Sequence, residues 1–509
     1  MGKIKILNPL FILLLIYTNI CSIHTVFSQP VKEITIQNAD SILSDKRIAD
    51  GANRLLGNVE LIINEALMTC DSAYYYPDQR VVHAYRHVYI NRGDTLKLWG
   101  DYMQYNEADS MIYVRKDVVL VNKESKLLTQ KLDYNLITDV GYYPVKGHIF
   151  SGDNELVSKK GAFYTNIDMA LFHDSVVIHT PEYQIFSDSL KYDTKNDISY
   201  FLDSTHIINQ ENHIKCERGW YNSKTRIFVI NKNAFLENKG RTLTGDSIYY
   251  DDNIAFGIAR SRVTINDTAR NVILKGNYAE YYQEPEKAYI TDSAVMLQVF
   301  EEDTLYLHAD TIRLTQDSLS RRIIFAYYHV KFFKSNMQGM CDSMFYSNYD
   351  SVLQFHREPA IWSGENQITA DYMELFLKNE QMDHMNMIGL AFLVSQNDTA
   401  HYNQVKGKEM EGLFTDNELY LIDVKGNGQS VYYLKDDKDN ELMGVNVSIC
   451  SNLKIFIRQR KPYIIKNLVN PDATLYPVEQ APRNEVILEK FKWLNDYRPL
   501  TKDDIFRWK

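Results

Sequence analysis

The sequence predicts an all-β protein, an elongated two-sheeted groove made of about twelve two-strand repeats. The first observation is a degenerate motif, clearest over Trp99–Tyr105 (WGDYMQY), that recurs about every 30 residues in the 509-residue chain. Repetition at this period indicates stacked supersecondary units. Within each copy, apolar and polar residues alternate, which is the period of a half-buried strand. The composition agrees, because 36 Tyr and 22 Phe stand against 12 Pro and no apolar stretch in the repeats has helical spacing.

One position of the motif, the anchor, is usually acidic. The anchors are Asp71, Asp101, Lys131, Lys160, Asp188, Glu217, Asp246, Asn277, Asp310, Asp342, Asp371 and Glu409. Acidic ladders bind Ca²⁺ in some β-solenoids, but those use glycine-rich nonapeptides, and here lysine or asparagine replaces several anchors. We therefore expect the anchors to serve at strand entries or turns.

Each unit is expected to fold as a strand, a polar turn and a second strand. Residues two and four after the anchor are mostly apolar, and a second alternating run follows about seventeen to twenty residues past the anchor. Segments such as Asn106–Asp109 and Asp193–Asp197 supply the turns between the runs. The residues expected to point inward are Val88, Ile90, Met103, Tyr105, Val118, Leu120, Leu190, Tyr192, Ile248, Tyr250, Val263, Ile265, Ile312, Leu314, Val330, Phe332, Met344 and Tyr346.

Residues 1–28 read as a secretory signal peptide, because a basic start precedes an apolar core over Leu10–Ile16. An uncleaved anchor is disfavoured by the short core. Lipoprotein processing at Cys21 is disfavoured because no small residue precedes that cysteine. Residues 29–50 would form a lead-in and residues 51–452 the repeat body, either as one body or as two or three jellyroll segments. Residues 453–509 would form a C-terminal cap or docking tail.

Four cysteines remain after such cleavage, Cys70, Cys216, Cys341 and Cys450. The first three lie one residue before anchors in distant repeats, whereas a disulfide needs Cα atoms within about 7 Å. We expect free thiols in the body. The net charge of −10 argues against a nucleic-acid partner.

Residues with the look of a catalytic or metal site have simpler explanations. His83 and His87 have a helical metal-ligand spacing, but in a strand they would lie some 13 Å apart. Ser451 and Lys454 match an acyltransferase spacing without its companion motifs. Gly426–Gly428 reads as a turn, because no helix pattern follows it. We expect no enzyme activity, no metal and no cofactor.

The G-D-x-x-x-Y unit followed by a V-x-I or V-x-L strand resembles the organic-solvent-tolerance (OstA-like) family. The resemblance covers about residues 50–450 and is clearest over Trp99–Leu120, Phe186–Ile208 and Leu243–Ile265. It implies a β-jellyroll, slightly open along one edge, whose apolar interior shields the acyl chains of lipopolysaccharide on the way to the outer membrane. The chain departs from the family's large members in lacking the strand run of a C-terminal outer-membrane barrel.

Two hypotheses for function follow. The first is a periplasmic lipid conduit in which the eighteen inward residues contact lipopolysaccharide or a related lipid. Its partners would be other transport-bridge components, a second copy joined by edge strands, or the outer-membrane translocon; association with the outer membrane is left open. The alternative is a structural or adhesive surface solenoid with a dry, packed interior and no ligand. A carbohydrate-acting enzyme is a third reading, but it would need clustered outer carboxylates that the sequence lacks.

Overall fold

The computed structural model describes residues 34–44, 51–93, 96–283, 286–319, 321–379, 381–436, 441–459 and 461–508. The expected signal peptide, residues 1–28, lies outside the described residues, as do residues 29–33 and 45–50 of the expected lead-in. Within the described ranges, none of the helices has the length and hydropathy that a membrane span requires.

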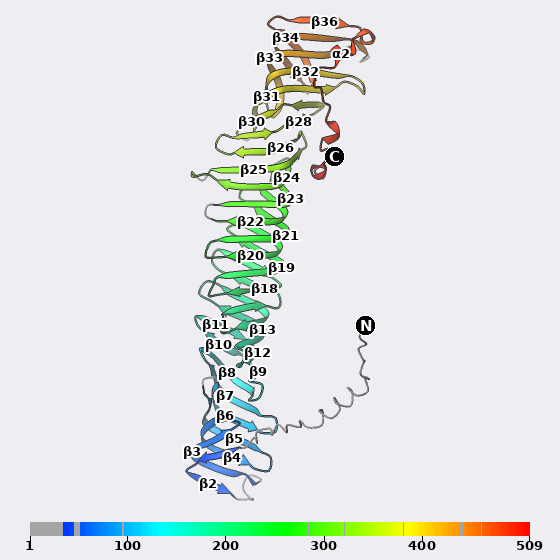
Figure 1. The fold of residues 1–509 in the computed structure, drawn as a ribbon. Helices are drawn as coiled ribbons and strands as arrows, with labels where there is room; N and C mark the ends of the chain where they lie inside the picture. The colour runs from blue at the N-terminus through cyan, green and yellow to red at the C-terminus, as the bar shows by residue number, and fades with distance from the viewer. Residues whose placement is uncertain are drawn as a thin grey trace, which may run out of the picture. The chain divides into compact units, whose positions relative to one another are not determined.

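The all-β prediction is confirmed, since antiparallel strands make up almost all of the described chain (Figure 1). The strands fall into two compact units, which we describe separately. Unit 1 runs to Gly152 and also includes Lys159–Met169, and unit 2 comprises Asp153–Ser158 and the chain from Ala170 onward.

Unit 1 contains the strands β1 (Thr35–Asn38), β2 (Ser41–Ser44), β3 (Asn53–Ile63), β4 (Ala66–Tyr76), β5 (Val81–Arg92), β6 (Leu96–Asn106), β7 (Met111–Asn122), β8 (Ser125–Asn135), β9 (Val140–Tyr143), β10 (Gly147–Ser151) and β12 (Lys160–Tyr164). Unit 2 begins with β11 (Asn154–Ser158), β13 (Met169–His179), β14 (Gln184–Asp193), β15 (Ile198–Phe201), β16 (Thr205–Ile208), β17 (Asn212–Cys216), β18 (Arg218–Asn222), β19 (Ile227–Asn238), β20 (Arg241–Asp251), β21 (Phe256–Asp267), β22 (Val272–Tyr282), β23 (Lys287–Val299) and β24 (Thr304–Gln316). It continues with β25 (Arg322–Lys334), β26 (Met337–Ser347), β27 (Val352–His356), β28 (Ala360–Ser363), β29 (Asn366–Thr369), β30 (Tyr372–Lys378), β31 (Gln381–Gln396), β32 (Tyr402–Thr415), β33 (Glu418–Lys435), β34 (Leu442–Arg458), β35 (Lys461–Leu468) and β36 (Asp472–Tyr476). Four short helical turns follow: η2 (Val478–Gln480), α2 (Arg483–Val486), η3 (Asn495–Tyr497) and η4 (Asp504–Phe506).

Most long strands bend in the middle, and the bend divides each of them between two walls. In the pairing of β6 with β7, the register runs from Lys97↔Val121 to Trp99↔Val119, breaks, and resumes from Tyr102↔Arg115. A long strand crosses from one wall to the other at its anchor or at its bend. We call the half-strands that precede an anchor or follow a bend the first wall. The half-strands that follow an anchor or precede a bend form the second wall. Both walls of a unit are therefore made by the same strands, and consecutive strands are antiparallel.

The bends are two-residue bulges in left-handed backbone conformation. In β7 the bend residues Lys116 and Asp117 have φ of 64° and 51°, and in β13 Asp174 and Ser175 have φ of 64° and 54°. Consecutive positive φ values occur at eleven such bends among the described residues: 57/58, 86/87, 116/117, 174/175, 232/233, 261/262, 292/293, 328/329, 357/358, 389/390 and 426/427. Two bend residues oppose one residue of the anchor strand there, so each bend inserts one extra residue, which turns the strand sharply.

Most anchors lie in mid-strand, so for them the expectation that they serve at strand entries or turns is wrong; it holds for Lys160, the first residue of β12, and for Glu217 and Asp371, which directly precede β18 and β30. Asp101 lies in the middle of β6 and forms an ion pair with Lys116 of the bend, which lowers the pKa of the Asp101 carboxyl. The same arrangement recurs as His87–Asp71, Lys232–Glu217, Arg262–Asp246, His329–Asp310 and Arg357–Asp342. These pairs are exposed and screened by solvent, so each contributes little to stability. In these pairs, the anchor carboxylate is the partner of a polar side chain of the bend.

The C-terminal residues 477–508 form a strap that runs back along the outer face of the first wall of unit 2 (Figure 1). Three buried glutamines hold it, and each uses its side chain to bind strap groups. Gln404 bonds the backbone of Val486 and Leu488, Gln367 that of Lys492 and Leu494, and Gln338 accepts from the Arg498 guanidinium. The apolar cluster of Val431, Tyr433 and Val445 packs against strap residues including Val486 and Leu488. The strap therefore replaces solvent on this face.

Replacing Gln367 by alanine should loosen the strap. Its amide donates to the Lys492 carbonyl at 2.8 Å and accepts from the Leu494 N–H at 2.7 Å, and its side chain is fully buried. Leaving two strap groups unpaired costs about 1–3 kcal/mol, so proteolytic release of the strap should accelerate about 5- to 150-fold. The exposed turn residue Gln210 provides the control, because Gln210→Ala should leave the rate unchanged. An unchanged rate for Gln367→Ala would contradict this account of the strap.

Candidate functional site

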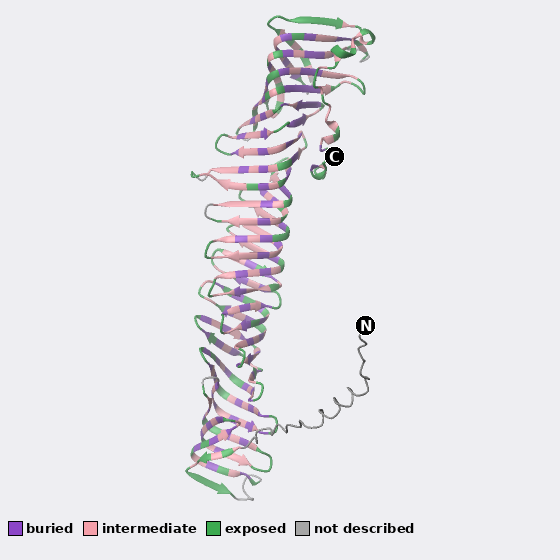
Figure 2. Cartoon of the chain, viewed as in Figure 1, coloured by how far each residue is buried: buried purple, intermediate pink, exposed green. Residues whose placement is uncertain are grey.

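The apolar interior between the two walls is the candidate site. Of the eighteen residues expected to point inward, fourteen are buried and four, Tyr250, Ile265, Leu314 and Tyr346, are half-buried. Polar neighbours such as Lys191 and Arg313 are exposed, as the alternation predicts. Figure 2 shows the buried positions alternating with exposed or half-buried ones along the strands.

The interior of unit 1 is closed. Val88, Ile90 and Met103 have no exposed surface, and Val118 and Leu120 keep 1%. Tyr105 is also buried, and burial is the main reason that its pKa is raised to about 12. Side chains from both walls thus fill the space between them in unit 1.

On the side opposite the bends, the strand ends and turns of the first wall meet those of the second wall. We call this line of contact the seam. In unit 1 the first-wall Arg92 forms an ion pair with the second-wall Asp139, and Lys123 pairs with Asp168 at 2.6 Å. In unit 2 Arg241 pairs with Glu286 at 2.6 Å. We call these three ion pairs latches; each joins residues 45 to 47 apart in the sequence.

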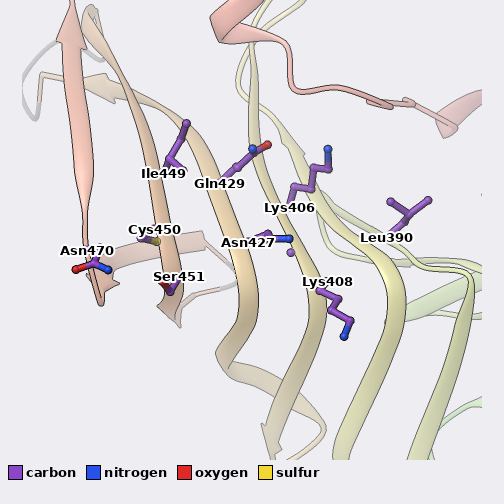
Figure 3. A pocket seen from close by; sticks show the side chains of 10 residues that line it. Leu390, Lys406, Lys408, Asn427, Gln429, Ile449, Cys450, Ser451 and Asn470 are labelled. Carbon is purple, nitrogen blue, oxygen red and sulfur yellow. The ribbon is translucent and has the colours of Figure 1, made fainter.

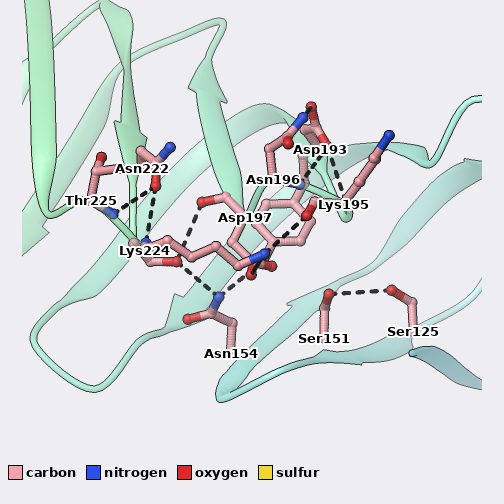
Figure 4. A network of polar contacts seen from close by, with 12 residues as sticks. Ser125, Ser151, Asn154, Asp193, Lys195, Asn196, Asp197, Asn222, Lys224 and Thr225 are labelled. Atoms are coloured by element: carbon pink, nitrogen blue, oxygen red, sulfur yellow. Dashed lines mark hydrogen bonds and ion pairs between the residues drawn. The ribbon is translucent and has the colours of Figure 1, made fainter. Parts of the chain in front are cut away.

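Uncharged groups also cross the seam in unit 2 (Figure 4). Asn154 of the first wall donates to the Tyr192 hydroxyl at 3.0 Å and to the Ser223 hydroxyl at 3.1 Å, and Tyr192 donates to Asp197 at 2.7 Å. Lys224 pairs with the same Asp197 at 2.9 Å. Among the described residues, no backbone ladder joins the walls at the seam, so side chains alone close it.

Farther along unit 2, a cavity of about 90 Å³ that is partly open to solvent lies at the seam. Its apolar floor includes Ile265, Leu274 and Leu314, drawn from both walls. This is where the inward residues are least buried: Figure 2 shows more half-buried positions over β20–β25 than in unit 1. The space would hold the end of an alkyl chain and no more.

Charged side chains form the rim of that cavity. Arg241 contacts both Glu286 and Asp267, and Arg270 pairs with Asp267 at 2.9 Å. Burial lowers the pKa of Arg241, but Glu286 and Asp267 outweigh it, so the pKa of this guanidinium is raised. Arg322 differs, because burial and then the charge of Arg270 lower its pKa.

A larger hollow, of about 590 Å³, lies at the bends of the last strands of unit 2 (Figure 3). Its lining is mixed, with polar residues such as Lys406, Lys408 and Asn427 beside the apolar Leu390 and Ile449. It lies on the bend side and contains none of the eighteen inward residues.

The thiols and imidazoles form no reactive cluster within the described ranges. Cys70, Cys216, Cys341 and Cys450 are all free and buried, and burial raises the pKa of each thiol, to about 11 for Cys70 and about 12 for Cys216. His83 contacts the Tyr102 hydroxyl at 2.8 Å, whereas His87 pairs with Asp71. No group of three or more potential metal ligands occurs in the part of the chain that the structure describes.

Comparison with known proteins supports the resemblance seen in the sequence. The family model of OstA-like proteins matches residues 31–188 and 184–246, so this part of the chain is OstA-like. Among solved structures, the chain is similar to LptH of Pseudomonas aeruginosa, described as the LptA-homologous periplasmic component of the conserved lipopolysaccharide transport device. The two are 12% identical with a TM-score of 0.22, and the alignment covers 28% of this chain and 99% of LptH. No match was found among curated proteins.

Proposed function

We propose that the chain is a non-enzymatic periplasmic conduit that shields the acyl chains of lipopolysaccharide, or of a related lipid, on the way to the outer membrane. The observation that carries this proposal is an apolar interior whose walls are joined at the seam only by side chains. The OstA-like match over residues 31–246 supports it independently. The same bent strands recur beyond that match, for example at 261/262 and 292/293.

The free energy gained by burying an alkyl chain exceeds the free energy of the ion pairs that close the seam, so a lipid could open it. Each exposed CH₂ costs about 0.8 kcal/mol in water, so burying a twelve-carbon chain gains roughly 10 kcal/mol. A partly exposed ion pair such as Lys123–Asp168 contributes about 1 kcal/mol or less. Parting the walls exchanges one set of apolar contacts for another, and apolar contacts have no directional register, so a chain could slide along the interior.

The ends of the units provide surfaces for partners. Among the described residues, the edge strands β1 and β36 pair on one side only, with β3 and β34, and most of their residues are exposed. Unpaired strand edges add strands from neighbouring chains. We propose that transport-bridge components or a second copy of this chain pair here, and that the lipid passes on to the outer-membrane translocon.

A structural solenoid with a dry interior is the second candidate, and the complete burial of Val88 and Ile90 favours it. The experiment that separates the two is purification of the mature chain from a Gram-negative envelope, followed by mass spectrometry of bound lipid. Stoichiometric acylated lipid supports the conduit. A folded chain that repeatedly carries no lipid would favour the solenoid.

A further inference from the structure

The seam cavity of unit 2 differs in charge from the latches of unit 1. In unit 1 each latch joins one cation to one carboxylate, Arg92 to Asp139 and Lys123 to Asp168. The cavity is lined by four cationic side chains and two carboxylates; the cations are Arg241, Arg270, Lys287 and Arg322, and the carboxylates are Asp267 and Glu286. The rim thus carries an excess of positive charge directly above an apolar floor.

Among the arginines at the cavity, Arg322 differs from Arg241 and Arg270, which both form ion pairs. Its side chain forms no hydrogen bond or ion pair with any described residue, although it is half-buried at the start of β25. Burial lowers the pKa of Arg322 by more than the charges of Asp267 and Glu286 raise it. The guanidinium has thus lost part of its hydration without gaining a direct ion-pair partner, which is unfavourable. Its planar donors match the oxygens of a phosphate or carboxylate bidentately. A bound anion would supply what the protein does not.

Apolar residues beneath the rim suit the rest of such a ligand. Ile265 and Leu274 belong to the first wall and Leu314 to the second, and all three line the cavity. The cavity of about 90 Å³ is too small for a whole acyl chain. The chain would therefore enter between the walls, and an anion that competes with Glu286 for Arg241 would open the latch that holds them together.

We propose that Arg241, Arg270 and Arg322 bind the phosphate group of an acylated amphiphile whose alkyl chain enters the seam beside Ile265, Leu274 and Leu314. This inference rests on the proposed function and adds a headgroup subsite to it. Headgroup binding and opening of the Arg241–Glu286 latch are one event at this site. The subsite selects anionic over neutral amphiphiles.

Calorimetric titration of the full mature chain below micelle-forming concentrations tests the subsite. The probes are dodecyl phosphate, the neutral dodecyl maltoside and inorganic phosphate. We expect dodecyl phosphate to bind most tightly, and Arg322→Gln to weaken it by about 10-fold or more while leaving the maltoside unchanged. The control is Arg313→Gln, an exposed arginine on the neighbouring strand, which should change neither affinity.

The remaining outcomes identify what would be wrong. Equal affinity of the two dodecyl probes, with no effect of Arg322→Gln, overturns the subsite and leaves the proposed function standing. If inorganic phosphate binds as tightly as dodecyl phosphate, the alkyl chain contributes nothing to binding. The site would then bind simple anions, and the proposal of an amphiphile would be wrong. A folded chain that binds neither dodecyl probe contradicts the proposed function itself.

Discussion

Cross-linking the seam of unit 1 should stop lipid from entering its interior while the chain stays folded. Lys123 and Asp168 face each other from the two walls, with their charged atoms 2.6 Å apart. Replacing both by cysteine and joining them with a short bismaleimide would fix the distance between the wall edges. Packed sheets lie about 10 Å apart with side chains filling the space, so an acyl chain cannot enter unless the walls move. The amount of lipid bound after cross-linking gives the result.

A cross-link within one wall controls for chemical modification. Lys126 and Phe150 are register partners on neighbouring strands of the first wall and are both exposed. Joining cysteines at these two positions should leave lipid binding unchanged. The native Cys70 of unit 1 should not react, because it is buried and burial raises its thiol pKa to about 11. Full lipid loading of the chain cross-linked at positions 123 and 168 would show that the seam is not the entry.

Placing a carboxylate in the interior, as in Ile248→Asp, should cause the largest loss of stability and of lipid binding. Ile248 has no exposed surface and is paired in register with Ile230 and Ala259. An unpaired ionised group there costs several kcal/mol and would meet the acyl chains directly. Ser247→Asp, on the opposite face of the same strand, should be nearly silent.

The pH dependence of that loss follows from linkage. Burial raises the pKa of the introduced carboxyl above its unfolded value of about 4, so the folded chain binds its proton more tightly than the unfolded chain does. The charge-dependent part of the penalty is therefore absent below about pH 4 and grows as the pH rises, until the pH reaches the folded-state pKa; the loss of the buried isoleucine remains at every pH. Chemical denaturation at several pH values measures it. A penalty that is independent of pH between 4 and 7 would contradict burial of the charge.

Alternation along the strands predicts the inward face because its physical cause is local. Met103 and Tyr105, or Val118 and Leu120, fall on one side of any strand that contains them, whatever the rest of the chain does. The four half-buried residues are the exceptions. Ile265 and Leu314 lie by the seam cavity, and whether the walls close there depends on side chains from distant strands.

The anchors are harder to interpret, because a polar residue in an alternating run suggests a boundary. Asp101 instead lies in mid-strand, opposite two consecutive polar residues, Lys116 and Asp117. That polar pair interrupts the alternation within one run and is the signal that could have revealed the bend. Nothing local in the sequence reveals the latches. Arg92 and Asp139 are 47 residues apart in the sequence and meet only when the two walls come together.

The strap is a similar case. Gln338, Gln367 and Gln404 occupy outward positions, where glutamine normally faces solvent. They are buried here because the C-terminal segment returns along the wall and forms hydrogen bonds with them. Contacts between residues more than eighty positions apart have no periodic trace in the sequence.

Site-specific photo-crosslinking to lipid tests most directly whether the interior carries lipid. A photoreactive amino acid would replace Ile248 or Ile265, which face inward, or Ser247 on the outer face of the same strand as Ile248. The conduit predicts lipopolysaccharide adducts from positions 248 and 265 and none from 247. Equal labelling from all three positions, or none from any of them in a folded chain, would contradict the conduit and leave the dry solenoid as the better explanation.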